Sequence, residues 1–197
     1  MPNAAINAVN GEIYLELADP IGEKINLNDN EPYRATYSMF ITGYTPASNP
    51  TDVLVIGPTI GKVVRIKQMV IEGAASSASN IIVSLIKRST ANTGGTFTTP
   101  TPVARDSNND ANGVNISLYS ANPTALGTSI GVIDGGRLNI APPSNGSIDR
   151  LQFQYSWLND QAIVLRPGGN EFLCVNLGGI AWPFGGSLDF NLMWTVE

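Results

Sequence analysis

The sequence of 197 residues holds few side chains of the types that carry catalysis. It has no histidine, the commonest general base and metal ligand, and its one cysteine, Cys174, lies in an apolar run typical of a small core residue. No Gly-x-Ser-x-Gly nucleophile motif is present. Acids for a glycosidase-type carboxylate pair are candidates only by elimination: Asp149, Asp160, Glu171 and Asp189. We therefore predict no catalytic residues and no enzyme, with a carbohydrate-active enzyme kept as an alternative.

Two short motifs resemble ligand-binding loops. Residues 57–62, Gly-Pro-Thr-Ile-Gly-Lys, are one residue short of a phosphate-binding loop and continue with Val63, where Ser or Thr should bind magnesium. Residues 106–110 carry the first three ligand positions of a calcium loop. Ala111 then replaces its sharp-turn glycine, and Ser117 its bidentate glutamate. We interpret both motifs as turns and predict no cofactor and no bound metal.

The aromatic residues indicate one candidate interface. Trp182, Pro183 and Phe184 are followed by two glycines, which is typical of a turn, so this is where an exposed aromatic is expected. Trp157 and Trp194 alternate in step with apolar residues and are predicted to lie in the core. We predict that Trp182, Pro183 and Phe184 form an interface anchor, with ordinary packing and a sugar contact as the alternatives.

The elements that position these residues are predicted to be β-strands. In residues 187–195, every second residue is a large apolar one, which is typical of a strand with one buried face. Turn clusters of Gly, Pro, Asn and Ser separate such runs, and no stretch has a convincing helical period. We predict an all-β protein, an antiparallel β-sandwich that is jelly-roll-like. Further strands are expected over residues 12–17, 37–42, 53–56, 63–71, 80–87, 115–119, 151–157, 161–165 and 171–177.

The predicted organisation is a single sandwich domain over residues 12–197, preceded by an extended N-terminal arm over residues 1–11. Residues 89–113 are long, polar and rich in Thr, Asn and Pro, which predicts a loop. Residues 63–64 and 81–83 are apolar on both strand faces. They are therefore expected in central strands or beneath a subunit contact.

Charge and apolar patterning exclude two classes of partner. The net charge is −5 and the few basic residues are scattered, whereas nucleic-acid binding depends on clustered Lys and Arg. No apolar run approaches the ~20 residues that cross a bilayer, and residues 1–5 lack the basic and apolar regions of a signal peptide. We predict no nucleic-acid partner and no membrane partner.

Several segments together resemble a known group of proteins. They are residues 85–96 (Leu-Ile-Lys-Arg-Ser-Thr-Ala-Asn-Thr-Gly-Gly-Thr), 106–108 (Asp-Ser-Asn), 119–124 (Tyr-Ser-Ala-Asn-Pro-Thr) and the ending 187–197 with its Trp194. Over residues 61–197 the chain resembles small β-rich proteins from tailed-phage and prophage structural genes, of the capsid-associated decoration or cement type.

This resemblance implies a virion structural protein that is made in the host cytoplasm, binds the major capsid protein and stabilises the phage head. The acidic net charge favours the outer capsid surface over the DNA-filled interior. Closed symmetry is usual among oligomers, and a homotrimer would match the local threefold positions of an icosahedral lattice. The alternative is a glycan-binding host-recognition module of a head or tail fibre.

Overall fold

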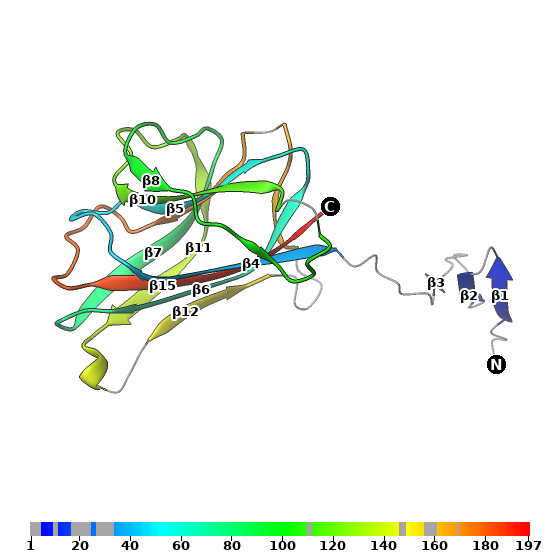
Figure 1. The fold of residues 1–197 in the computed structure, drawn as a ribbon, viewed down its shortest axis with the longest axis horizontal. Coiled ribbons are helices and arrows are strands. Elements are labelled where there is room, and N and C mark those ends of the chain that lie inside the picture. Colours follow the sequence, from blue (N-terminus) through cyan, green and yellow to red (C-terminus); the bar gives the residue numbers. More distant parts are fainter. Residues whose placement is uncertain are drawn as a thin grey trace. The chain divides into compact units, whose positions relative to one another are not determined.

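The computed structural model describes the chain as two compact units, Met1–Arg34 and Ala35–Glu197 (Figure 1). In the first unit it describes the backbone of three short strands and Arg34, and in the second it describes residues 35–109, 112–145, 149–155, 161–168 and 170–197. The described part of the chain is almost entirely strand, with one 3-10 turn, η1 (Pro143–Asn145). None of the described helical segments has the length and apolarity needed to cross a membrane.

The first unit contains an antiparallel sheet in the order β1 (Ala5–Val9), β2 (Glu12–Glu16) and β3 (Ile25–Asn26). The structure therefore draws the domain boundary later than the sequence analysis did. Residues 5–9 of the predicted arm form a strand, and residues 12–16 pair with that strand instead of entering the sandwich.

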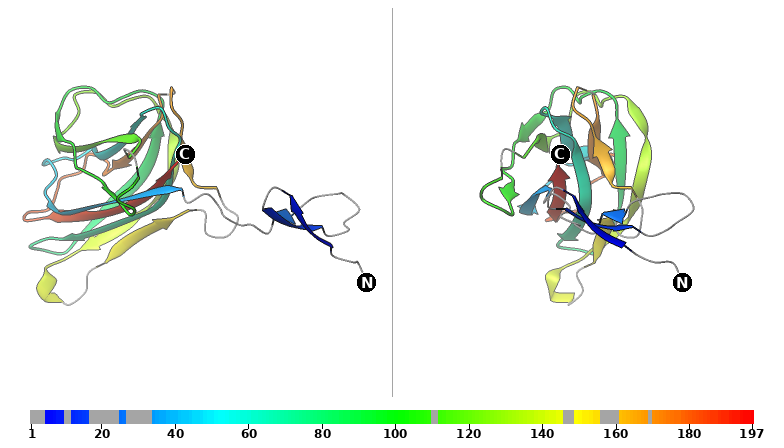
Figure 2. Two further views of the ribbon diagram at one scale, coloured as in Figure 1. Left: turned by 45° about the vertical axis from the view of Figure 1, so that its right-hand side comes forward. Right: turned by 90° about the vertical axis from the view of Figure 1, so that its right-hand side faces the viewer.

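The second unit is an antiparallel sandwich, which confirms the predicted fold class. Its two sheets pack face to face (Figure 2). Sheet I has the order β11 (Ser129–Ile140), β7 (Ser79–Arg88), β14 (Phe172–Asn176), β5 (Asp52–Thr59), β10 (Val114–Ala121) and β8 (Thr96–Thr98). Sheet II has the order β12 (Arg150–Gln154), β6 (Val64–Ala74), β15 (Ser187–Val196), β4 (Ala35–Tyr44) and β9 (Val103–Ala104), and β13 (Ile163–Leu165) also pairs with β6.

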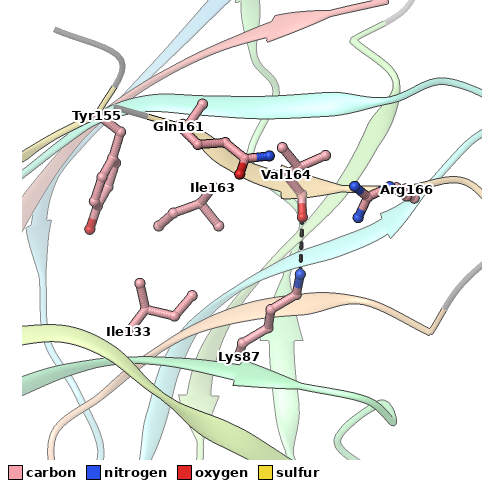
Figure 3. A pocket seen from close by; sticks show the side chains of 8 residues that line it. Lys87, Ile133, Tyr155, Gln161, Ile163, Val164 and Arg166 are labelled. Atoms are coloured by element: carbon pink, nitrogen blue, oxygen red, sulfur yellow. Dashed lines mark hydrogen bonds between the residues drawn. The ribbon is translucent and has the colours of Figure 1, made fainter. Parts of the chain in front are cut away.

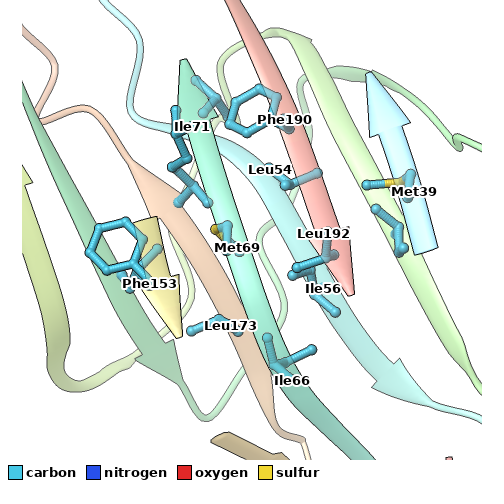
Figure 4. Close-up of a cluster of buried hydrophobic side chains, with 14 of the residues drawn as sticks. Met39, Leu54, Ile56, Ile66, Met69, Ile71, Phe153, Leu173, Phe190 and Leu192 are labelled. Atoms are coloured by element: carbon cyan, nitrogen blue, oxygen red, sulfur yellow. The ribbon is translucent and has the colours of Figure 1, made fainter. Parts of the chain in front are cut away.

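The core lies between the two sheets, where the inward side chains of both meet (Figure 4). On β15 the predicted inward face is confirmed, because Leu188, Phe190, Leu192 and Trp194 are fully buried. The strands β6 and β7, which contain most of the two segments that are apolar on both faces, each have a neighbouring strand on both sides. This matches the expectation that these segments lie in central strands. The outward Ile82 on β7 is nevertheless substantially exposed.

The sequence analysis missed β11, a long strand at the edge of sheet I. Glycines interrupt its alternation and two register shifts against β7 break its period, so the pattern does not have a period of two. Gly135 is required by packing, because a Cβ there would lie 2.8 Å from the backbone carbonyl oxygen of Val83. The predicted loop 89–113 also contains the short strands β8 and β9.

Candidate functional site

The predicted aromatic anchor lies in the connection between β14 and β15. The Trp182 backbone N–H donates to Ser48 O at 2.7 Å and its indole Nε1–H to Gly186 O at 2.9 Å, while its ring packs against the core. Trp182 therefore holds the turn in place. Pro183 is half-buried, whereas the neighbouring Phe184 side chain is 88% exposed. Of these three residues, Phe184 is the one that presents a large apolar surface to solvent.

The two loop-like motifs have the structure of turns. Residues 57–59 are the end of β5, and residues 60–63 connect them to β6, which begins at Val64, so this strand–turn–strand arrangement lacks the helix of a phosphate-binding loop. In the calcium-like motif, Asp106 Oδ1 accepts the Asn108 backbone N–H at 3.0 Å, which is an Asx turn. Asp110 lies outside the described residues. Among those that are described, no group of three or more Asp, Glu or Cys side chains could hold a metal ion.

The candidate acids lie on different elements, and Asp160 falls outside the described residues. Asp149 precedes β12, and backbone hydrogen bonds led by that from Asn139 lower the pKa of its carboxyl. Glu171 precedes β14 and lies 3.5 Å from Lys87 Nζ. Asp189, on β15, accepts the Gly43 backbone N–H at 2.6 Å. Its cross-strand neighbour is Glu72 on β6, an acid that the sequence analysis did not single out.

A pocket of about 490 Å³ lies beside β13, between Lys87, Ile133, Tyr155 and Ile163 (Figure 3). Two of its polar side chains, Lys87 and Tyr155, are already engaged within the protein. Lys87 Nζ donates to Val164 O at 3.1 Å, and the Tyr155 hydroxyl donates to Asp134 at 3.2 Å. Burial first, and then the Asp134 charge, raise the pKa of Tyr155, so its phenol stays protonated. We assign this pocket to the scaffold.

The outward face of sheet II is hollowed and polar. A cavity of about 340 Å³ opens over β12, β6, β15 and β4. We call its lining the polar face of sheet II; it consists of Phe40, Gln68, Val70, Glu72, Arg150, Gln152, Asp189 and Asn191.

The edge of sheet I exposes apolar side chains. On β11, Ile130 is 60% exposed, Val132 is 63% exposed and Ile133 is 43% exposed. We call these three residues the β11 edge. Single exposed apolar residues are normal, but several together on a long edge strand are typical of a contact surface.

The segments that carry the phage resemblance belong largely to the scaffold. Within residues 85–96, Arg88 and Asn92 both bind the buried Asp52 carboxylate. In the segment 119–124, the side chain of Asn122 accepts the Thr51 N–H and donates to Asn49 O. Trp194, near the C-terminal end, is buried in the core. These residues are therefore engaged in interactions within the sandwich.

Cys174 is buried on the outward side of β14, in a small cluster with Val55, Tyr119 and Phe172. This confirms the predicted burial of the thiol. Burial raises the pKa of Cys174, with the nearby Asp52 charge acting in the same direction, so the reactive thiolate is scarce. We expect no reaction of the native protein with a disulfide reagent over an hour, and one thiol per chain after denaturation. Rapid labelling of the native protein would contradict this.

Comparisons with protein-family models, with curated proteins and with solved structures gave no match.

Proposed function

We propose that the chain is a non-enzymatic capsid decoration, or cement, protein of a tailed bacteriophage. In this role it forms a homotrimer on the outer surface of the head, binds the major capsid protein and stabilises the shell. The observation that carries the proposal is the β11 edge, and the resemblance described above supplies the identity of the partner.

The β11 edge has the properties of a surface that another protein covers. β11 is twelve residues long, pairs with β7 on one side and stands at the end of sheet I. A long edge strand with exposed apolar side chains favours pairing with another chain unless bulges or charges prevent it. β11 has two register shifts, and Asp134 follows Ile133. These features disfavour backbone pairing of β11 with the edge strand of any other chain. They leave the apolar side chains available to a partner whose surface is complementary in shape.

The composition supports the same role. Charged residues make up 14% of the chain, well below the usual quarter or so, so the surface relies on short uncharged polar groups. Such side chains lose little conformational entropy when a neighbour covers them. The net charge of −5 favours the outer surface, because phosphate repulsion would oppose a place among packaged DNA.

The β11 edge predicts the effect of two substitutions on capsid binding. Burying a Val or Ile side chain contributes about 1.5–3 kcal/mol, so Ile130→Asp and Val132→Asp should each weaken binding by at least about tenfold. The measurement is co-sedimentation of the purified full chain with capsids that lack it. Ile60→Asp is the matched control, because Ile60 is equally apolar and 61% exposed but lies outside β11. We expect it to bind capsids as the unchanged protein does.

Mass spectrometry of purified virions should find the chain at a fixed ratio to the major capsid protein. Its absence from virions, together with failure of the unchanged protein to sediment with capsids, would remove the proposal. Equal loss of binding in the Ile60→Asp control would show that the β11 edge has no special part in it.

A further inference from the structure

The polar face of sheet II is built from side chains held in register on neighbouring strands. One row crosses the sheet through Gln152 on β12, Val70 on β6, Asn191 on β15 and Phe40 on β4. The next row contains Arg150, Glu72 and Asp189 on the first three of these strands. Side chains directly opposite each other on antiparallel strands have Cβ atoms roughly 4.5–5.5 Å apart. The two rows therefore form one continuous surface of amide, carboxylate and guanidinium groups.

One aromatic ring borders these polar groups. Phe40 is 67% exposed. It lies on the outward face of the ten-residue strand β4, whose inward residues Tyr37 and Met39 are buried. Val70 lies between the polar side chains of Gln152 and Asn191 in the same row, so the floor of the cavity is partly apolar. The cavity, about 340 Å³, falls within the ~300–1,000 Å³ range of small-molecule sites.

We propose that the polar face of sheet II is a binding site for a neutral oligosaccharide. An amide can donate to or accept from the adjacent hydroxyls of a sugar ring, and an ionised carboxylate can accept from them. The face of a sugar ring that bears its C–H bonds is apolar and packs on an exposed aromatic side chain such as Phe40. The combination of an exposed ring, three amides, two carboxylates and an arginine provides both kinds of contact in one cavity.

Part of this site is held in place before any ligand binds. The Gly43 backbone N–H donates to Asp189 Oδ1 at 2.6 Å, which fixes the orientation of that carboxylate. The Gln152 amide donates to Gln154 Oε1 at 3.3 Å. Groups that are already oriented lose less conformational freedom on binding, which favours affinity.

The charges of the site select against acidic sugars. Arg150 contributes one positive charge, whereas Glu72 and Asp189 each contribute a negative charge, so the lining is net acidic. The whole chain is acidic as well, with a net charge of −5. Uronic acids and sialic acids would meet repulsion on approach, whereas neutral hexoses would not.

This inference stands apart from the capsid proposal, because it rests on sheet II and the β11 edge belongs to sheet I. A decoration protein that carries such a site would bring a phage particle to host surface glycans. A fibre module would use the same site for the same purpose, so the site favours neither assembly over the other.

The test is native affinity electrophoresis of the full chain in gels that contain dextran, mannan or galactan, with alginate as the acidic comparison. We expect at least one neutral polysaccharide to retard the unchanged protein. Phe40→Ala and Asn191→Ala should each reduce this affinity by about tenfold or more. Ile60→Ala is the control, because it removes a side chain that is exposed to a similar degree (61%) but lies outside the polar face of sheet II, and it should leave the retardation unchanged. Circular dichroism checks that each variant is folded.

Three outcomes would overturn the site: no retardation by any neutral polysaccharide, equal retardation of Phe40→Ala and the unchanged protein, or retardation by alginate alone. Release of reducing ends that disappears in Glu72→Gln would support a sugar site here and overturn the non-enzymatic role proposed above. Loss of capsid binding with intact retardation would overturn the capsid proposal alone.

Discussion

Replacing Asp52 by alanine is expected to lower the free energy of unfolding by about 3–5 kcal/mol, the usual effect of removing one partner of a buried ion pair. The Asp52 side chain is fully buried and that of Arg88 is almost so. Arg88 Nε and Nη2 donate to the two carboxylate oxygens at 2.7 and 2.9 Å. Without Asp52, the guanidinium would remain buried with no opposing charge at these distances.

The Asp52–Arg88 pair also contacts β14 at its last residue, Asn176, and two connections, the one after β7 and the one before β11. Asn92 and Asn176 donate to the carboxylate at 2.9 and 2.7 Å, and Arg88 Nη1 donates to Gly127 O at 2.8 Å. The Asn92 side chain in turn accepts the Gly127 backbone N–H at 2.8 Å. Loss of the carboxylate therefore leaves the buried Arg88 donors and the part-buried amide donors of Asn92 and Asn176 without this acceptor. A buried donor left in this way costs about 1–3 kcal/mol before relaxation.

An exposed ion pair in the same unit provides the control. Arg65 and Glu197 are 2.8 Å apart, with about a quarter to a third of each side chain exposed, so Glu197→Gln should cost only about 0–1 kcal/mol. Denaturant titration of both variants gives the comparison. The double variant Asp52→Leu with Arg88→Met should recover part of the loss, since neither charge then stays buried alone. A loss for Asp52→Ala no larger than that for Glu197→Gln would contradict the assignment.

The same network predicts how stability depends on pH. Burial raises the pKa of Asp52, but the hydrogen bonds from Arg88, Asn176 and Asn92 and the Arg88 charge outweigh it, so the net pKa is lowered. A carboxyl whose pKa is lower in the folded state stabilises the fold above its unfolded pKa of about 3.9, and this stability is lost as the pH falls through the folded pKa. Asp52→Asn should therefore flatten the acid limb of stability below about pH 4.

The alternation of apolar and polar residues was enough to predict the strands that have one buried face and one solvent-exposed face. On β15 the residues Leu188, Phe190, Leu192 and Trp194 follow that rule, and all four are buried. The burial of Cys174 was predicted from the apolar run around it, and the thiol is indeed buried, in a cluster with Val55, Tyr119 and Phe172. Such features depend on local sequence, because a strand with one buried face has a period of two wherever it lies in the sheet.

Features that depend on pairing between distant strands could not be predicted in this way. Asp52 and Arg88 are 36 residues apart, and nothing in either segment indicates that they meet. Glu72 and Asp189 become neighbours only through the register of β6 and β15. The strand β11 was not predicted, because its exposed side chains and glycines do not alternate with buried residues. The proposed functional surfaces come from this second group, since the strand order determines which side chains they contain.

Replacing Trp194 by alanine is expected to lower the free energy of unfolding by about 3–5 kcal/mol, a loss typical of large-to-small substitutions of buried aromatics. Trp194 is fully buried and stacks on Tyr37 with ring centroids 6.0 Å apart. Its indole Nε1–H donates to Asn112 O at 3.1 Å, which ties the end of β15 to the segment before β10. The substitution therefore creates a cavity, removes an aromatic contact and leaves a carbonyl without this donor.

Two further variants separate these contributions in calorimetric unfolding. Trp194→Phe keeps most of the ring volume but removes the N–H, so its cost should be about half that of Trp194→Ala or less. Trp182→Ala is the matched control, because Trp182 also donates its indole N–H to a backbone carbonyl but is only half-buried. Since less apolar surface is uncovered there, the cost should be smaller than that of Trp194→Ala. An equal or larger loss for Trp182→Ala would mean that the turn between β14 and β15, and not the end of β15, contributes more to the stability of the sandwich.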